Sequence, residues 1–326
     1  MSEPILELKQ VSKIFDAGTE HEVPAVRDVS LRVMPGDSVG IVGESGCGKS
    51  TVARMVTKLI DATSGEIWFD GENITNFGEK EWKRIYRKIQ MVFQDPYSVF
   101  SPRMRVGTFL EEGLVHFGIC SRAEARKEAA ELMKMVELDP ALMDRLPHQL
   151  SGGQLQRVVI ARAISIRPKL VFLDEATSAL DVSVQKQILR LLVRLQKELK
   201  LTYVFIGHDL AVVRSICERI AVMYAGQVVE VFDSKDLGKN TGHPYTQKLL
   251  GSVFSVHDRN QKEIQLETLS MEDSGYEKQG CVYQRRCPYV TEQCRRETPQ
   301  MEDCGTPHRI ACWHPLCGGH HEHEHE

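Results

Sequence analysis

The sequence contains no run of about eighteen apolar residues, which is the shortest stretch read as a membrane-spanning helix. Its first residues, Met1 to Pro4, are not followed by the apolar stretch of a secretory signal. Positive and negative charges are nearly balanced, with 41 Lys and Arg residues and 45 Asp and Glu residues. We therefore expect a cytoplasmic protein that has no affinity for nucleic acid and reaches membranes only through partners.

Hydrophobic residues make up 42% and charged residues 26% of the chain, as in ordinary globular proteins. The 326 residues are enough for one large domain and an appendage. Composition changes near residue 235, beyond which the chain is more polar and then rich in cysteine. We therefore predict one domain over 1–235 and a C-terminal extension over 236–326.

A glycine-rich loop follows a short apolar run over 37–42 and precedes a segment with helical spacing. Residues 43–51 read GESGCGKST, the pattern of a phosphate-binding loop. Lys49 is expected to reach the β- and γ-phosphates of a nucleotide, and the Ser50 hydroxyl to bind Mg²⁺. The residues expected to line the nucleotide are Gly43, Ser45, Gly46, Cys47, Gly48, Lys49, Ser50 and Thr51.

An acidic pair, Asp174 and Glu175, follows the apolar run 170–173. A second apolar run, 202–207, reads as another buried strand, and the amphipathic segment 184–199 between them reads as a helix. Asp174 would hold Mg²⁺ through water at the strand end. Glu175 would polarise the water that attacks the γ-phosphate.

A third motif, LSGGQLQR over 150–157, lies between the phosphate loop and the acidic pair. With FQDP around Gln94, SALD over 178–181 and GHDL around His208, it completes a fixed order of motifs. In this order the sequence resembles the ATPase subunits of ABC transporters. One departure is Ala176, where family members usually have proline.

The resemblance implies a fold and a set of roles. The fold would be a RecA-like P-loop α/β core, with an N-terminal antiparallel β-subdomain, an α-helical subdomain at about 98–165 and a small cysteine-rich extension. Phe15 would stack on adenine, Gln94 would sense Mg²⁺ and the attacking water, and His208 would contact the γ-phosphate. The remaining family residues are Ser151, Gly152, Gly153 and Gln154 of the signature and Asp181 of the D-loop.

The signature implies a dimer, because in the family its N–H groups complete the phosphate pocket of the opposite subunit. The chain has one phosphate loop and one signature, so it would pair with a sister ATPase subunit or with itself. Two membrane permease subunits would complete the transporter. An extracytoplasmic substrate-binding protein would act on it indirectly, and ATP and Mg²⁺ would be its cofactors.

Several phrases, including GHPYTQKLL over 242–250, resemble the oligopeptide/dipeptide/nickel importer group, and within it the second, F-like ATPase subunit. This implies ATP-driven import of peptides at the cytoplasmic face of the membrane. Two alternatives stay open: a nickel or other metal importer, and a soluble ABC ATPase attached to an enzyme complex of the phosphonate-lyase type. The sequence does not name the cargo.

Four cysteines of the extension, Cys281, Cys287, Cys294 and Cys312, lie on a segment with little apolar content. They resemble the tail that holds a [4Fe–4S] cluster in some peptide-importer ATPases; zinc and free thiols are the alternatives. So short a segment is expected to need a metal for its stability.

Two smaller expectations concern single features. Cys47 lies at a helix N-terminus two residues from Lys49, which favours a reactive thiolate. The HHEHEHE end, 320–326, is either a metal-trapping tail or a purification tag.

Overall fold

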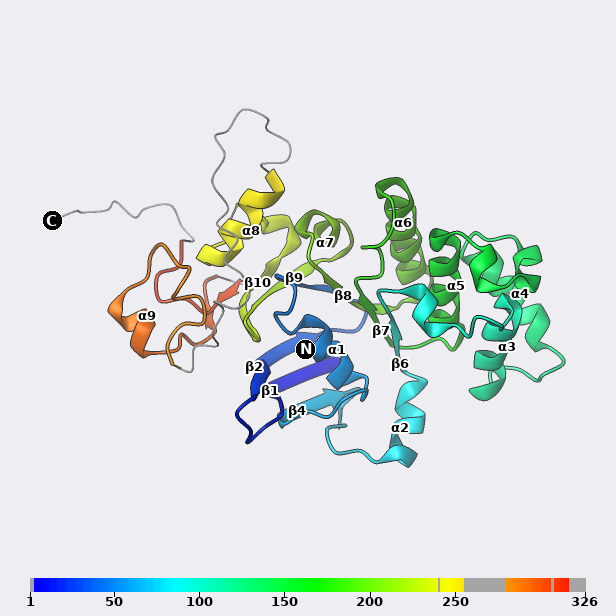
Figure 1. Cartoon of the computed structure of the whole chain (residues 1–326), viewed down its shortest axis with the longest axis horizontal. Coiled ribbons are helices and arrows are strands. Elements are labelled where there is room, and N and C mark those ends of the chain that lie inside the picture. Colours follow the sequence, from blue (N-terminus) through cyan, green and yellow to red (C-terminus); the bar gives the residue numbers. More distant parts are fainter. Residues whose placement is uncertain (1–2, 240, 255–278, 306–307, 317–326) are drawn as a thin grey trace.

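The computed structural model describes residues 3–239, 241–254, 279–305 and 308–316, and its centre is an eight-stranded sheet (Figure 1). Strands β6, β7, β8, β3 and β9 run parallel, whereas β10, β12 and β11 add antiparallel pairs at one edge. In spatial order the strands are β11 (Glu302–Asp303), β12 (Arg309–Ile310), β10 (Gln227–Asp233), β9 (Arg219–Tyr224), β3 (Ser38–Val42), β8 (Thr202–Gly207), β7 (Leu170–Asp174) and β6 (Ile89–Val92).

The central strands are apolar on both faces, as a covered parallel sheet requires. On β8, Val204 and Ile206 pack into one core cluster, while Tyr203 and Phe205 pack into the other. Each of these four side chains is at most 2% exposed, and burial of such a side chain contributes about 1.5–3 kcal/mol. The alternation fixes the register, because a slip of one residue would exchange the two faces.

A separate four-stranded antiparallel sheet covers one of these faces. Its N-terminal strand pairs with both β2 and β4 (Figure 1), whereas β3 and α1 (Lys49–Val56), which lie between β2 and β4 in the chain, belong to the main sheet and the helix that follows it. The strands in spatial order are β2 (Val23–Val33), β1 (Leu6–Phe15), β4 (Ser64–Phe69) and β5 (Glu72–Asn73).

A helical lobe lies beyond β6 and β7, at the right of Figure 1. It is built from α3 (Val106–His116), α4 (Ala125–Met135) and α5 (Gly152–Ser165), with two short 3₁₀ helices between α4 and α5. Among the described residues, no helix has the length and apolarity needed to cross a membrane. The other helices are α1 (Lys49–Val56), α2 (Glu79–Tyr86), α6 (Val182–Leu199), α7 (Leu210–Ile216), α8 (Pro244–Phe254) and α9 (Glu292–Arg296).

The predicted fold class is confirmed: a parallel α/β core carries an antiparallel sheet and a helical lobe. Strands β9 and β10 form a hairpin whose turn residues, Ala225 and Gly226, both lie at positive φ. The helix expected at 184–199 begins two residues earlier, at Val182.

The C-terminal extension packs on the core instead of standing apart. Strand β12 pairs with β10, which adds the extension to the main sheet. Tyr283 is 2% exposed and belongs, with Cys281 and Cys294, to the larger core cluster. The described part of this segment therefore has a source of stability other than a metal, because it shares the apolar core of the larger domain, and its dependence on a metal stays a prediction.

A buried carboxylate joins the extension to β10. Glu230 is fully buried, and it accepts hydrogen bonds from the backbone N–H of Gly242 (2.6 Å) and of His243 (3.3 Å). The His308 Nε2 lies 2.7 Å from the same carboxylate. Buried polar groups need such partners, so Glu230 fixes where the chain leaves and rejoins the sheet.

We predict that His308→Ala lowers the free energy of unfolding by about 2 kcal/mol, because a buried charged acceptor loses a partner. Urea denaturation measures the change. The matched control is Arg309→Ala, which removes an exposed ion pair with Asp303 and should cost well under about 1 kcal/mol. Equal effects of the two substitutions would contradict the role given to Glu230.

Candidate nucleotide site

The phosphate loop connects the end of β3 to the start of α1, and two of its glycines are required by close contacts. A Cβ added to Gly43 would lie 2.1 Å from the carbonyl oxygen of Met223. A Cβ added to Gly48, whose φ is 101°, would lie 2.2 Å from the carbonyl oxygen of Ala25. The backbone of two neighbouring segments therefore sets the shape of the loop.

Lys49 is the first residue of α1, and its side chain folds back over the loop. The residue is only 4% exposed. Its Nζ donates hydrogen bonds to the carbonyl oxygens of Gly43 (2.9 Å) and Glu44 (2.8 Å). A buried ammonium group is thus held at a helix N-terminus, where an anionic phosphate is electrostatically favoured.

Ser50 and Asp174 meet beside this lysine. The Ser50 hydroxyl donates a hydrogen bond of 2.8 Å to the Asp174 carboxylate, which stands at the end of β7 and is 5% exposed. Burial raises the pKa of Asp174, and the Ser50 hydrogen bond offsets part of that rise. A desolvated carboxylate beside a hydroxyl is an oxygen donor set that suits Mg²⁺.

Glu175 follows β7 and contacts the residues that follow two other strands, β6 and β8. Its Oε2 accepts a hydrogen bond of 2.9 Å from Gln94, which follows β6, and its Oε1 lies 3.6 Å from Nδ1 of His208, which follows β8. Glu175 itself has φ 46°, a strained conformation for a non-glycine residue, and its N–H donates to the carbonyl of Ile206 at 3.0 Å. The three residues predicted to act on the γ-phosphate therefore lie together.

The signature residues lie elsewhere, at the N-terminus of α5 in the helical lobe (Figure 1). Ser151 caps this helix: its Oγ accepts from the Gln154 N–H, and the Gln154 side chain accepts from the Ser151 N–H. A Cβ at Gly153 would lie 2.5 Å from Val184 of α6, so glycine is required for this close packing. Gly152 is the first residue of the helix, which leaves its N-terminal N–H groups at the surface.

Two further predicted residues are at the surface. Phe15, at the end of β1, is 38% exposed, and the Nζ of Lys13 lies 5.1 Å from the centre of its ring. An exposed ring of this kind is available for stacking on a base. Asp181 is exposed and directly precedes α6.

Cys47 differs from the expectation. Its side chain is buried, and burial raises the pKa of the thiol, although Lys49 acts in the opposite direction. The thiolate predicted from the loop position is therefore disfavoured, because desolvation outweighs the nearby ammonium group.

The four cysteines of the extension do come together. Cys281, Cys287, Cys294 and Cys312 are free thiols and line one small cavity next to His243 and His314. Burial raises the pKa of Cys281, Cys287 and Cys312. Within the described ranges, no three Cys, His, Asp or Glu side chains are already arranged as a metal site. Cys304 is disulfide-bonded, whereas Cys317 and 320–326 lie outside the described residues.

Sequence analysis missed three residues around the phosphate loop. Glu44 lies within the loop motif but was not assigned a role. Its partners, Tyr245 and Arg286, come from the extension and lie 201 and 242 residues further along the chain. The apolar pattern gives no sign of a contact at this separation. The glutamate inside the loop was the one available signal.

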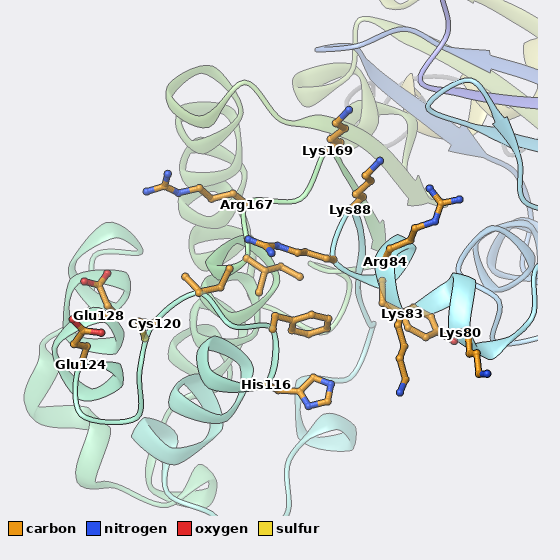
Figure 2. Close-up of a pocket in the computed structure, with 15 residues that line it drawn as sticks. Lys80, Lys83, Arg84, Lys88, His116, Cys120, Glu124, Glu128, Arg167 and Lys169 are labelled. Carbon is orange, nitrogen blue, oxygen red and sulfur yellow. The ribbon is translucent and has the colours of Figure 1, made fainter.

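A second hollow in the structure carries different chemistry. It is lined by basic side chains of α2 and of the segments before β6 and β7, among them Lys83, Lys88 and Lys169 (Figure 2). Neither the phosphate loop nor Gln94, Glu175 or His208 lines it. The nucleotide site is therefore assigned to the loop and the three strand ends, and not to this hollow.

Comparison with known proteins identifies the family of the chain. The sequence matches the ABC transporter family over residues 26–178 and the oligopeptide/dipeptide transporter C-terminal region over 229–294. It is 40% identical to the oligopeptide transport ATP-binding protein AppF of Bacillus subtilis, with 95% of this chain and 97% of that protein covered. The oligopeptide transport ATP-binding protein OppF of Haemophilus influenzae is 40% identical, with 88% of each chain covered.

Solved structures point the same way. A dimeric ATP-binding cassette named MJ0796, in a post-hydrolysis state bound to ADP and Pi, is 35% identical with a TM-score of 0.64, covering 70% of this chain and 98% of that one. CbiO1 of Clostridium perfringens, part of the ABC transporter complex cbiONQ, is 28% identical with a TM-score of 0.66, covering 78% and 96%. The chain belongs to the ABC transporter ATP-binding family and is an ATPase of the oligopeptide/dipeptide group.

We predict that Cys47 is alkylated slowly at neutral pH. Because its pKa is raised, the Cys47 thiol stays protonated over the pH range in which an ordinary cysteine ionises. Its labelling rate should therefore keep rising at pH values above that range. Mass spectrometry after timed iodoacetamide labelling measures this, with Cys120 of the helical lobe as the more accessible comparison. Faster labelling of Cys47 than of Cys120 at pH 7 would restore the reactive-thiolate interpretation.

Proposed function

We propose that this ATPase, bound at the cytoplasmic face of the membrane, powers the import of di- or oligopeptides into the cell. The main support is the geometry of Glu175, which joins Gln94 and His208 next to the Ser50–Asp174 pair. The C-terminal match and the names of the relatives support peptides as the cargo.

Each residue of the cluster takes a separate part in ATP hydrolysis. Glu175 would accept the proton of the attacking water, with Gln94 orienting that water and His208 contacting the γ-phosphate. Lys49 would release its two carbonyl partners and bind the β- and γ-phosphates. Ser50, Asp174 and Gln94 would hold Mg²⁺, which would neutralise phosphate charge when bound.

The adenine and the domains are assigned in the same way. We propose that Phe15 stacks on adenine, since its ring is exposed at the edge of the antiparallel sheet. Residues 1–235 would act as the ATPase domain, with 98–165 as its helical subdomain, and 236–326 as the extension. Gly43, Ser45, Gly46, Gly48 and Thr51 would bind the phosphates through the loop.

A single chain would supply half of each active site. Ser151, Gly152, Gly153 and Gln154 lie at an exposed helix N-terminus in the helical lobe, which suits them to the γ-phosphate held by a second subunit. Asp181 would contact that subunit as well. We propose a dimer with a sister ATPase subunit, docked on two permease subunits that receive peptide from a binding protein.

The proposed permease contact is the segment after Gln94. Tyr97 is 48% exposed, whereas Phe100 is 8% exposed and stacks on Phe109 with ring centres 3.9 Å apart. Tyr97 can therefore contact a partner, while Phe100 anchors the segment in the helical lobe. Motion of Gln94 on hydrolysis would in this way be passed to the permease.

We predict that Glu175→Gln keeps ATP binding but lowers turnover on the order of 10²-fold or more, because the general base is lost. The assembled importer should then take up no labelled peptide. The matched control is Glu131→Gln on the exposed face of α4, which should leave turnover unchanged. Full-rate hydrolysis by Glu175→Gln would remove Glu175 from the mechanism, and uptake of nickel in place of peptide by the wild-type importer would favour the alternative cargo.

The cysteine cavity supports a second proposal: a [4Fe–4S] cluster held by Cys281, Cys287, Cys294 and Cys312. Four free thiols around one cavity fit the cluster's usual ligand set, although they would have to move toward one another. When bound, the cluster would cross-link the segments that carry these cysteines. Zinc would use the same thiolates.

We predict that anaerobically purified protein contains iron and acid-labile sulfide, and that Cys287→Ser removes both. Because the extension shares the main core, the variant should keep its fold, seen as an unchanged far-UV circular dichroism spectrum. Cys120→Ser, outside the cavity, serves as the control and should keep the iron. One equivalent of zinc and no iron would show that the cysteines form a zinc site and not a cluster. Absence of any metal would show that they are free thiols and would contradict the proposal.

A further inference from the structure

An ion pair joins the C-terminal extension to the phosphate loop. Arg286 donates two hydrogen bonds to the Glu44 carboxylate, at 2.8 Å and 3.1 Å, so that the two planar groups meet as a fork. The side chain of Arg286 is 26% exposed and that of Glu44 is 42% exposed. Bidentate pairs of this kind are more directional than single hydrogen bonds.

A second contact fixes the backbone of the same residue. The N–H of Glu44 donates a hydrogen bond of 2.9 Å to the hydroxyl of Tyr245, which is fully buried at the start of α8. This N–H therefore points at the extension and away from the cradle of N–H groups expected to bind phosphate. Glu44 is held by the extension through both its backbone and its side chain.

Aromatic packing keeps these two partners in place. The rings of Tyr224, Tyr245 and Tyr283 lie 4.6 to 5.4 Å apart, centre to centre. The Arg286 guanidinium lies 5.8 Å from the centre of the Tyr224 ring. Tyr224 ends β9, so the cluster connects the main sheet with both parts of the extension, and Arg286 has little freedom to leave Glu44.

The position of Glu44 gives this contact a consequence for nucleotide binding. The carbonyl oxygen of Glu44 accepts a hydrogen bond from Lys49, the lysine expected to bind the β- and γ-phosphates. The Glu44 carboxylate would be a like charge next to ATP if it were unpaired. Its pairing with Arg286 neutralises that charge and so removes the repulsion.

We propose that Arg286 is a positioning residue for the ATPase reaction: through Glu44 it sets the affinity of the phosphate loop for Mg–ATP. The proposal rests on nucleotide binding at this loop, as described above. The extension thereby holds the phosphate loop in place through its contacts with Glu44.

The test compares Mg–ATP affinity and turnover in four variants of the full chain. Arg286→Ala should raise KM and the Kd of a fluorescent ATP analogue about fivefold, the effect of one partly screened charge, with kcat changed less than about twofold. The KM and Kd of Arg286→Lys should fall between those of the wild type and of Arg286→Ala, because lysine keeps the positive charge but cannot form the two-hydrogen-bond fork. Arg296→Ala is the matched control: it removes an Arg–Glu pair of similar length inside the extension, away from the loop.

The fourth variant separates electrostatics from folding. Adding Glu44→Gln to Arg286→Ala removes the unpaired charge, so affinity should return toward the wild-type value. A purely structural role would leave the double variant as weak as Arg286→Ala, and would overturn the proposal. Unchanged affinity in Arg286→Ala, with wild-type protein binding ATP, would also overturn it. Absence of ATP binding in the wild type would instead refute the nucleotide site itself.

Discussion

The shape of the phosphate loop is the constraint on which the other features depend, because a loop can bind phosphate only if its N–H groups turn inward. Three neighbours impose that shape from behind: the carbonyl of Met223 against Gly43, the carbonyl of Ala25 against Gly48, and the hydroxyl of Tyr245 on the N–H of Glu44. They come from the main sheet, the antiparallel sheet and the C-terminal extension. The main sheet, the antiparallel sheet and the extension thus each supply one contact to the same short loop, whereas the helical lobe supplies none of these three.

The strand order explains how the proposed catalytic side chains come together. Parallel strands β6, β7 and β8 are neighbours, so the residues just after them, Gln94, Glu175 and His208, are brought to one edge although they are far apart in the chain. The signature is built differently, on a helix N-terminus in the helical lobe. In the proposed mechanism one chain therefore has the base and the phosphate loop on one surface and a second anion site on another. This separation is what makes a two-subunit active site reasonable.

Much of this could be read from the sequence, and what could not has a physical reason. The phosphate loop and the acidic pair carry local patterns, and the structure places the loop between β3 and α1 and the pair at the end of β7. The state of Cys47 was misjudged because its position suggested a helix dipole, whereas burial decides its pKa. The extension was expected to depend on metal, yet Tyr283 and the Glu230–His308 contact join it to the core. The Arg286–Glu44 pair spans about 240 residues, and no local pattern encodes a contact of that kind.

The measurement that tests the two-subunit active site most directly is the ATPase rate per subunit as a function of subunit concentration. It is made with the chain alone and with its sister ATPase subunit added, at saturating Mg–ATP. If the signature of one subunit completes the site of another, the rate per subunit rises with concentration and reaches a plateau as dimers form. A rate per subunit that is constant over the whole range, with and without the sister subunit, would show that one chain hydrolyses ATP by itself and would contradict the shared site.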